Sequence, residues 1–210
     1  MSPRQYHSPL REARAEATRR QVLEATEALL TEAPIEALSI PKVAKRAGVS
    51  APTVYRYFPT TDDLLRAFID HVRPRLGMGL DQIAAYEPPD LPALPRKTFR
   101  GFEEAGALLR SVMDSPTWNR IRLERPKDRA GAVLHRFTGR ASRLDERSLR
   151  AALGPLYLLA TPSAWRWLRE TWGLSAADSA KAAAWAISVL ARELWADPAS
   201  IEPVALEDES

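Results

Sequence analysis

The sequence contains no cysteine among its 210 residues. This absence excludes disulfides, a catalytic thiol and metal sites built on thiolates. No apolar run is long enough to cross a bilayer, and the amino-terminal stretch MSPRQYHSPLREAR lacks the hydrophobic region of a secretory signal. We therefore expect a soluble, cytoplasmic protein that does not bind a membrane.

Motifs for catalysis or cofactor binding are also absent. The three histidines, His7, His71 and His135, do not share a metal-ligand spacing with each other or with carboxylates. The sequence has no Gly-Lys-Ser/Thr phosphate loop, no complete dinucleotide loop and no Gly-x-Ser-x-Gly elbow. Adjacent acidic pairs such as Asp62–Asp63 point apart on a helix and cannot form an acid–base couple. We therefore expect neither an enzyme nor a bound metal or cofactor.

Charge is distributed unevenly along the chain, although the formal net charge is only +3. The segment between Glu36 and Asp62 contains no acidic residue but several basic ones, whereas residues 197–210 are acidic and contain no base. A basic, acid-free segment beside tyrosines is typical of a surface that approaches phosphates. A solvated basic face explains the same charges, so this pattern alone leaves both interpretations open. The basic residues of the segment are Lys42, Lys45, Arg46 and Arg56.

Almost no segment shows the alternating pattern of a strand, and alanine, leucine, arginine and glutamate dominate. This composition and spacing predict an all-α fold. Pro155 and Pro162 should bend or split one of the later helices. The expected helices cover residues 15–31, 40–47, 51–58, 62–76, 96–113, 116–124, 127–142, 145–171 and 175–195.

The segment AKRAGVSAPTVYRYF predicts two short helices joined by a tight turn. Ser39 can cap the first of them, and Gly48 suits the left-handed position after its last turn. Ser50 can cap the second. Two short helices joined by such a glycine-containing turn form a helix-turn-helix.

The second of these short helices has two distinct sides. Val54 and Phe58 share a face that should pack on the preceding helices. Arg56 points the opposite way and is flanked by Thr53 and Tyr55. These groups can donate hydrogen bonds to phosphate oxygens and base edges, and a helix of this size fits the major groove of DNA.

The stretch SIPKVAKRAGVSAPTVYRYFPTTDDLL resembles the DNA-binding domain of TetR-type (TetR/AcrR) transcriptional regulators. The later stretch AWRWLRETWGLSAADSAKAAAWAISVL is similar to the last two helices of many such proteins. The resemblance implies an N-terminal three-helix DNA-binding domain with a helix-turn-helix, followed by a larger helical domain for effector binding and dimerisation. We divide the chain accordingly into a flexible arm (1–14), the DNA-binding domain (15–60), the helical domain (61–196) and an acidic tail (197–210).

The resemblance also implies roles for individual residues in binding double-stranded DNA. The residues nearest the bases would be Ala51, Pro52, Thr53 and Arg56, and those nearest the phosphates Tyr55, Tyr57, Ser39 and Lys42. The chain departs from the family at Thr61, where a phosphate-binding lysine is usual, and at Ala51, which cannot read a base edge by hydrogen bonding. Both departures suggest fewer contacts per half-site or more reliance on the amino-terminal arm.

Plainer interpretations of these residues stay open. Tyr55 and Tyr57 could cover the small helical core, and Arg56 could be a solvated charge. The amino-terminal arginines could form an arm in the minor groove or a disordered tail. These arginines are Arg4, Arg11, Arg14, Arg19 and Arg20.

The carboxy-terminal part carries many large apolar residues on amphipathic helices, most of which should form the core. Helical bundles also place ligand sites between their helices, and in the family an effector binds there. The candidate effector-binding residues are Phe102, Met113, Trp118 and Phe137.

The last two helices carry more aromatic surface than one helix face needs, which fits an isologous homodimer interface. A core within one subunit is the alternative. The candidate interface residues are Trp165, Leu168, Trp172, Trp185 and Val189.

Together, these observations predict a homodimeric DNA-binding transcriptional regulator, a repressor that a small-molecule effector releases from a palindromic operator. The rival interpretation is a helical scaffold or protein-interaction module whose helix-turn-helix serves only for packing. A steep salt dependence of DNA binding would separate the two.

Overall fold

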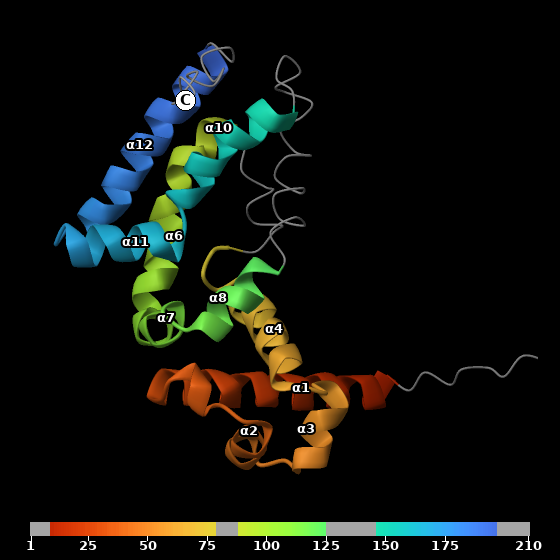
Figure 1. Cartoon of the computed structure of the whole chain (residues 1–210). Coiled ribbons are helices and arrows are strands. Elements are labelled where there is room, and N and C mark those ends of the chain that lie inside the picture. The colour runs from red at the N-terminus through yellow and green to blue at the C-terminus, as the bar shows by residue number, and fades with distance from the viewer. Residues whose placement is uncertain (1–8, 79–87, 125–145, 197–210) are drawn as a thin grey trace, which may run out of the picture. The chain divides into compact units, whose positions relative to one another are not determined.

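The computed structural model describes residues 9–78, 88–124 and 146–196. Within these ranges every regular element is a helix and none is a strand, which confirms the predicted all-α fold. The chain divides into two compact units, one of residues 1–71 with 107–124 and one of residues 72–106 with 125–210. Figure 1 labels the helices.

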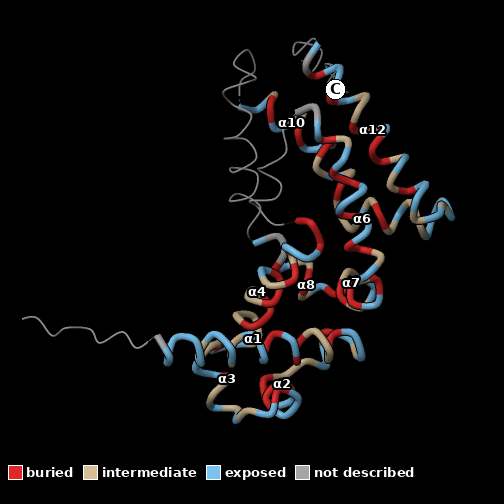
Figure 2. Tube along the Cα trace, turned by 180° about the vertical axis from the view of Figure 1, so that it is seen from behind, coloured by how far each residue is buried: buried red, intermediate tan, exposed pale blue. Residues whose placement is uncertain are grey.

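The first three α-helices of the first unit share a buried core. Its buried side chains include Val22, Val43 and Val54, one from each of its first three α-helices, and all three are fully excluded from solvent. Figure 2 colours the buried residues of the chain red. The unit comprises α1 (Pro9–Glu32), the 3-10 turn η1 (Ile35–Ala37), α2 (Ile40–Ala47), α3 (Ala51–Tyr57), α4 (Thr61–Val72), α7 (Gly106–Met113) and α8 (Pro116–Leu123), except for the last residue of α4 and the first of α7.

Helices α7 and α8 belong to the first unit although they lie far along the sequence. The Ser115 hydroxyl caps α8 and donates a hydrogen bond of 2.7 Å to Glu36 Oε1, 79 residues earlier. The rings of Trp118 in α8 and Phe68 in α4 pack edge to face with centroids 6.5 Å apart. The first unit therefore extends beyond the DNA-binding domain of residues 15–60 expected from the sequence.

The second unit has its own apolar core. Its buried side chains include Leu91 from the segment before α6, Leu149 from α10 and Leu194 from α12. None of these leucines is more than 8% exposed. A second aromatic contact joins Phe102 to Trp165, with ring centroids 6.1 Å apart. The described elements are η2 (Pro88–Ala93, a 3-10 helix), α6 (Leu94–Glu104), α10 (Glu146–Leu158), α11 (Pro162–Arg166), the π-helix η3 (Trp167–Thr171) and α12 (Ala176–Ala196).

Several helix boundaries differ from the sequence-based expectation. Helix α1 begins at Pro9 rather than at residue 15, because proline suits a first turn and the alanine, arginine and glutamate that follow are strong helix formers. The expected helix 96–113 is divided into α6 and α7 at Ala105. The expected helix 145–171 is split before Pro162 as predicted, whereas Pro155 lies inside α10 without ending it. The expected helix 127–142, residues 1–8 and the acidic tail lie outside the described residues.

Candidate nucleic-acid interface

The turn between α2 and α3 has the geometry that its sequence predicts. Gly48 adopts a left-handed conformation with φ of 67°, and its N–H donates to the carbonyls of Ala44 and Lys45. Ser50 then begins α3, where its hydroxyl accepts a hydrogen bond of 3.3 Å from the N–H of Thr53. These two caps end one helix and start the next within a few residues, and so form the predicted helix-turn-helix.

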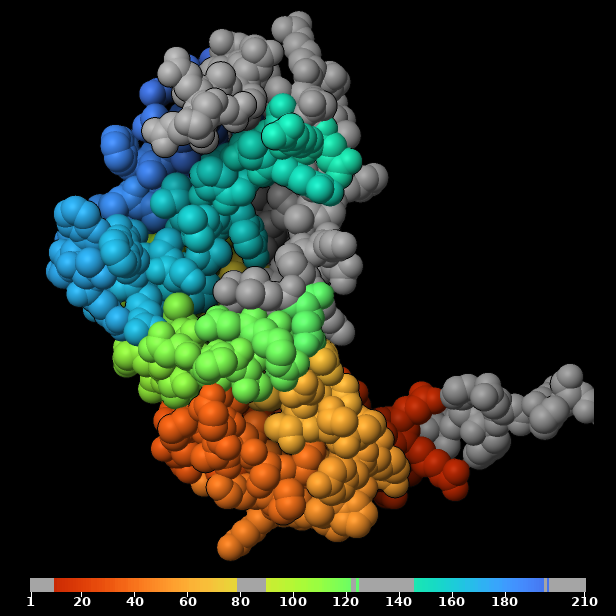
Figure 3. Space-filling model, viewed as in Figure 1, coloured from red at the N-terminus to blue at the C-terminus, as the bar shows by residue number. Residues whose placement is uncertain are grey.

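Helix α3 buries one side and exposes the other. Val54 is fully buried and Phe58, just after the helix, is 2% exposed, as their spacing predicts. On the other side Pro52, Tyr55 and Arg56 are exposed, while Ala51, Thr53 and Tyr57 are half-buried. In Figure 3, α2 and α3 lie on the orange surface at the bottom of the first unit. The side of α3 that remains open to a partner therefore carries a phenol, a guanidinium and a hydroxyl.

Arg56 is held by its neighbour rather than by an acid. Its Nη2 donates to the Tyr57 hydroxyl at 3.3 Å, and its Cζ lies 5.1 Å from the centroid of the Tyr57 ring. This pairing orients both side chains together on the exposed side of α3.

Helix α2 supplies further polar groups. Ser39 occupies the N-cap position with an extended backbone, but its hydroxyl makes no capping hydrogen bond. Lys42 is exposed, and its ammonium donates to the carbonyl of Ala37 at 2.8 Å. The basic segment is not acid-free in space, because Arg46 pairs with Glu32 of α1 with Nη1 to Oε2 at 3.1 Å. No local pattern in the sequence indicates this pair, whose members lie 14 residues apart.

The start of α4 carries a reciprocal cap. The Thr60 hydroxyl accepts from the N–H of Asp63 at 3.1 Å, and Asp63 Oδ2 accepts from the N–H of Thr60 at 3.2 Å. This reciprocal pair of hydrogen bonds is the capping-box arrangement. Thr61, where the resembled family has a lysine, is half-buried beside this cap.

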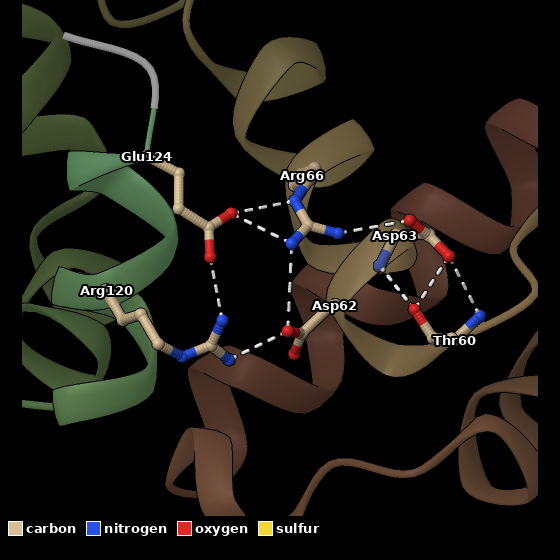
Figure 4. A network of polar contacts seen from close by, with 6 residues as sticks. All are labelled: Thr60, Asp62, Asp63, Arg66, Arg120 and Glu124. Atoms are coloured by element: carbon tan, nitrogen blue, oxygen red, sulfur yellow. Dashed lines mark hydrogen bonds and ion pairs between the residues drawn. The ribbon is translucent and has the colours of Figure 1, made fainter.

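A network of four alternating charges joins α4 to the end of α8 within the first unit (Figure 4). Arg66 binds Glu124 with Nη2 to Oε2 at 2.8 Å, and Arg120 binds Asp62 with Nη2 to Oδ2 at 2.8 Å. Arg120 Nη1 also lies 2.8 Å from Glu124 Oε1. Arg66 Nη2 lies 3.8 Å from Asp62 Oδ2, and this fourth contact closes the ring. Sequence reasoning missed this network because no local pattern links residues so far apart.

The network shifts the ionisation of its members. The hydrogen bond from Arg66 is the main reason that the pKa of Glu124 lies below its usual value. The same contact raises the pKa of Arg66, and the hydrogen bond to Asp62 raises that of Arg120. Beside the ring, the Thr60 hydroxyl lowers the pKa of Asp63. These contacts favour the charged forms of Glu124, Arg66 and Arg120, as ion pairing requires.

The candidate effector-binding residues are divided between the two units. Phe102 is fully buried in the second unit, against Phe99 and Trp165. Met113 and Trp118 belong to the first unit, where Trp118 packs on α4. Phe137 lies outside the described residues.

The candidate dimer residues also separate into two groups. Trp165 is only 2% exposed, and its Nε1 donates to Glu103 Oε1 at 2.8 Å, so it belongs to the core of one chain and not to a surface. In contrast, Trp172 and Trp185 are 68% and 70% exposed. Leu168 and Val189 are half-buried. Sequence reasoning missed two further exposed apolar side chains on the same helical segments, Trp167 and Leu190.

An open groove of about 450 Å³ lies in the second unit beside η2 and α12. Its lining includes Arg96, Lys181 and Trp185, but none of the candidate effector-binding residues. The described ranges contain no group of three or more histidine, aspartate or glutamate side chains placed to hold a metal ion. No helix in these ranges is both long and apolar enough to span a membrane.

Residues 22–68 match the family of bacterial regulatory proteins described as the tetR family, which confirms the resemblance seen in the sequence. The chain is 36% identical over 63 residues to the HTH-type transcriptional regulator EthR of Mycobacterium tuberculosis. It is 46% identical over 57 residues to the HTH-type transcriptional repressor LfrR of Mycolicibacterium smegmatis. These alignments cover 30% and 27% of this chain and only 29% of each relative. Both relatives are transcriptional regulators, in agreement with the expectation of a non-enzymatic chain.

A wider likeness exists at the level of the fold. A solved tetR-family transcriptional regulator from Streptomyces coelicolor aligns with 87% of this chain and 84% of its own, with a TM-score of 0.57 and 19% sequence identity. Identity this low shows the fold alone. That fold is a helix-turn-helix domain followed by a larger helical domain, as predicted.

Proposed function

We propose that this chain, whose residues 22–68 belong to the TetR family of bacterial regulatory proteins, is a cytoplasmic, homodimeric DNA-binding transcriptional regulator. It acts as a repressor that a small-molecule effector releases from a palindromic operator. The observation that carries the proposal is the division of α3 into a buried apolar side and an exposed polar side. Val54 and Phe58 anchor the helix, and Tyr55 and Arg56 remain available to DNA.

The proposed contacts follow from the two sides of the helix-turn-helix. Arg56 offers several donors to a guanine edge in the major groove, and the Ala51 methyl group offers an apolar contact to a thymine methyl. Pro52 and Thr53 lie on the same amino-terminal part of α3 and complete the base-facing set. Phosphates are bound by Ser39, Lys42, Tyr55 and Tyr57.

Ser39 supports this assignment because its hydroxyl is not used to cap α2. A free hydroxyl at the start of a helix, next to backbone N–H groups, is suited to a phosphate oxygen. Lys42 supports it because its ammonium is exposed and binds only a backbone carbonyl within the described residues. That carbonyl contact can be exchanged for a phosphate without leaving a buried charge.

The homodimer is proposed to form through α12 and the segment before it. The interface residues are Leu168, Trp172, Trp185 and Val189, with Trp167 and Leu190 added and Trp165 removed. Exposed apolar patches mark interaction sites. Trp167, Trp172 and Trp185, which each have more than half of their surface exposed, are the side chains that would form such a patch. A twofold dimer presents two α3 helices and therefore requires a palindromic operator.

The effector is proposed to bind within the helical second unit, where Phe102 lies among aromatic side chains. Met113 and Trp118 lie in the first unit, and their assignment to the effector site stays a prediction. Release requires that the effector favour one arrangement of the protein over another. Linkage makes the effect reciprocal, so operator DNA must weaken effector binding by the same factor, typically about 5- to 150-fold.

The proposal is tested by selecting bound duplexes from a random-sequence pool with the full chain. We expect enrichment of a palindrome whose half-site centres present two major grooves on one side of the DNA. Binding to the selected duplex, measured by fluorescence anisotropy, should weaken steeply as salt increases. A pool that shows no enrichment after repeated selection would instead support the helical scaffold, whose helix-turn-helix only packs.

A further inference from the structure

The amino-terminal half of α1 buries none of its described side chains. The first fully buried residue of this helix is Val22, and every residue from 10 to 21 is exposed or half-buried. A segment from Pro9 to Val22 is about 20 Å long at the rise of an α-helix. Figures 1 and 2 show this end of α1 extending past α3. A helix end that contributes nothing to the core needs another explanation for its composition.

One side of α1 faces the helix-turn-helix. Gln21 Nε2 donates to the carbonyl of Ala47, the last residue of α2, at 2.7 Å. The Cζ of Arg19 lies 5.5 Å from the centroid of the Phe58 ring, just after α3. Around the axis of α1, the side that faces α2 and α3 therefore lies between the positions of Gln21 and Arg19.

Two arginines continue this side toward the amino terminus. Arg14 precedes Gln21 by seven residues, and Arg11 precedes Val22 by eleven. These spacings are close to two and three helical turns, so the arginines lie on the same side as the residues that they precede. The same side of α1 thus packs on the helix-turn-helix in the carboxy-terminal half of the helix and carries Arg11 and Arg14 in the amino-terminal half. We call these two arginines the basic stripe.

The opposite side of α1 is acidic. Arg20 lies nine residues after Arg11, which is half a turn away around the helix, and it shares its side with Glu24 and Glu27. Within the described residues, Arg11 and Arg14 have no hydrogen-bonded or ion-paired side chain, and both are exposed. The basic stripe therefore carries two uncompensated charges on the side of α1 where α3 lies.

We propose that Arg11 and Arg14 bind backbone phosphates of the duplex that flanks the half-site read by α3. The inference rests on the proposed function, and it deepens that function by adding a helical surface outside the helix-turn-helix. Charge complementarity selects the partner, since duplex DNA carries one phosphate charge for about every 1.7 Å of its axis. The part of α1 before Arg19 is about 15 Å long, which is the length of about four base pairs.

The test compares two duplexes that contain the same selected operator. The short duplex ends at the operator boundaries, and the long duplex adds ten base pairs of arbitrary sequence on each side. Arg11→Ala and Arg14→Ala each remove one charge from the basic stripe, and Arg20→Ala removes one from the opposite side as the matched control. Alanine favours the helix, so none of these variants should unfold α1.

On the long duplex, Arg11→Ala and Arg14→Ala should each weaken binding several-fold near 0.1 M salt. Each should also reduce the slope of log affinity against log salt by about 0.9, the value for one phosphate contact. Neither variant should change binding to the short duplex, and Arg20→Ala should change neither duplex. Equal losses on both duplexes, or a loss for Arg20→Ala as large as for Arg11→Ala, would overturn the inference.

Failure of the inference differs from failure of the proposed function. One outcome is that the parent selects an operator, Arg56→Ala no longer binds it, and the α1 variants bind the long duplex like the parent. This outcome would support the proposed function and overturn the inference about Arg11 and Arg14. If the parent selects no operator at all, both are overturned.

Discussion

Arg66 of α4 donates two hydrogen bonds to a single carboxylate oxygen of Glu124, at 3.0 Å from Nε and 2.8 Å from Nη2, although 58 residues separate them. Glu124 ends α8, and α4 follows directly after the recognition helix of the proposed DNA-binding domain. Arg120 and Asp62 complete the ring from the same two helices. The orientation of α4 is therefore fixed by charge as well as by apolar packing.

Because of this ring, the free energy of unfolding should fall at acidic pH. The pKa of Glu124 is lower in the folded chain than its ordinary value of 4.5, mainly because Arg66 binds its carboxylate. The stabilisation is fully present above pH 4.5 and is lost as the pH falls through the lower, folded-state pKa. We expect Glu124→Gln to lose less stability than the parent between pH 6 and pH 3, measured by urea unfolding.

Glu104→Gln serves as the control for this experiment, because Glu104 is an exposed glutamate outside the ring. Its acid profile should match that of the parent. The role given to the ring would be wrong if Glu124→Gln and Glu104→Gln showed the same profile.

The helix-turn-helix could be predicted from the sequence because its signals are local. Gly48 and Ser50 mark one helix end and the next helix start, and Val54 repeats at helical spacing with Phe58. Each signal acts within a few residues, so no distant contact can reverse it.

The parts that could not be predicted depend on distant contacts. Glu36 and Ser115 bring α8 into the first unit across 79 residues, and neither residue carries a pattern that identifies its partner. Trp165 and Trp185 both lie on amphipathic segments near the carboxy terminus, yet one is buried and the other exposed. Periodicity shows that a helix has an apolar side, but not whether that side faces its own chain or another.

The two candidate caps of the helix-turn-helix should respond differently to the same substitution. Ser50→Ala removes a hydroxyl that caps α3 and should lower the free energy of unfolding by about 1 kcal/mol. Ser39→Ala removes a hydroxyl that makes no capping bond, so stability should change little while DNA affinity falls. Thermal unfolding and anisotropy titrations measure the two effects. Equal destabilisation by both substitutions would show that Ser39 caps α2 in solution.

Gly48 should be intolerant of side chains for a backbone reason alone. A Cβ at this position would have no other atom within 4 Å, so steric contact is not the obstacle. The obstacle is the positive φ, which is unfavourable for a residue with a Cβ. Gly48→Ala should therefore lower the free energy of unfolding by about 1–2 kcal/mol. Gly48→Asn should cost less, because asparagine tolerates the left-handed conformation. Chemical denaturation that ranks asparagine below alanine would contradict this explanation.

Arg56 and Lys42 should separate base recognition from phosphate binding. Arg56→Ala should weaken binding to the selected operator by about 1–3 kcal/mol and relax the preference at one base position. Stability should hardly change, because Arg56 is exposed. Lys42→Ala should weaken all duplexes alike and flatten the salt dependence. The recognition-helix assignment fails if Arg56→Ala binds the operator as tightly as the parent does.

Two tryptophans of the carboxy-terminal segments distinguish a dimer interface from a core. Trp165 is buried and hydrogen-bonded to Glu103, so Trp165→Ala should lower the free energy of unfolding by about 3–5 kcal/mol.

Trp185 is 70% exposed in the single chain, so Trp185→Arg should leave the fold of each chain intact. In a dimer, however, the new charge would be buried at the interface without a partner, which opposes association. Sedimentation velocity should therefore show folded monomers of Trp185→Arg, and these should bind the palindromic operator weakly because the two α3 helices are no longer linked. A fully dimeric Trp185→Arg would move the interface away from this side of α12, while leaving the DNA-binding proposal to be judged on Arg56.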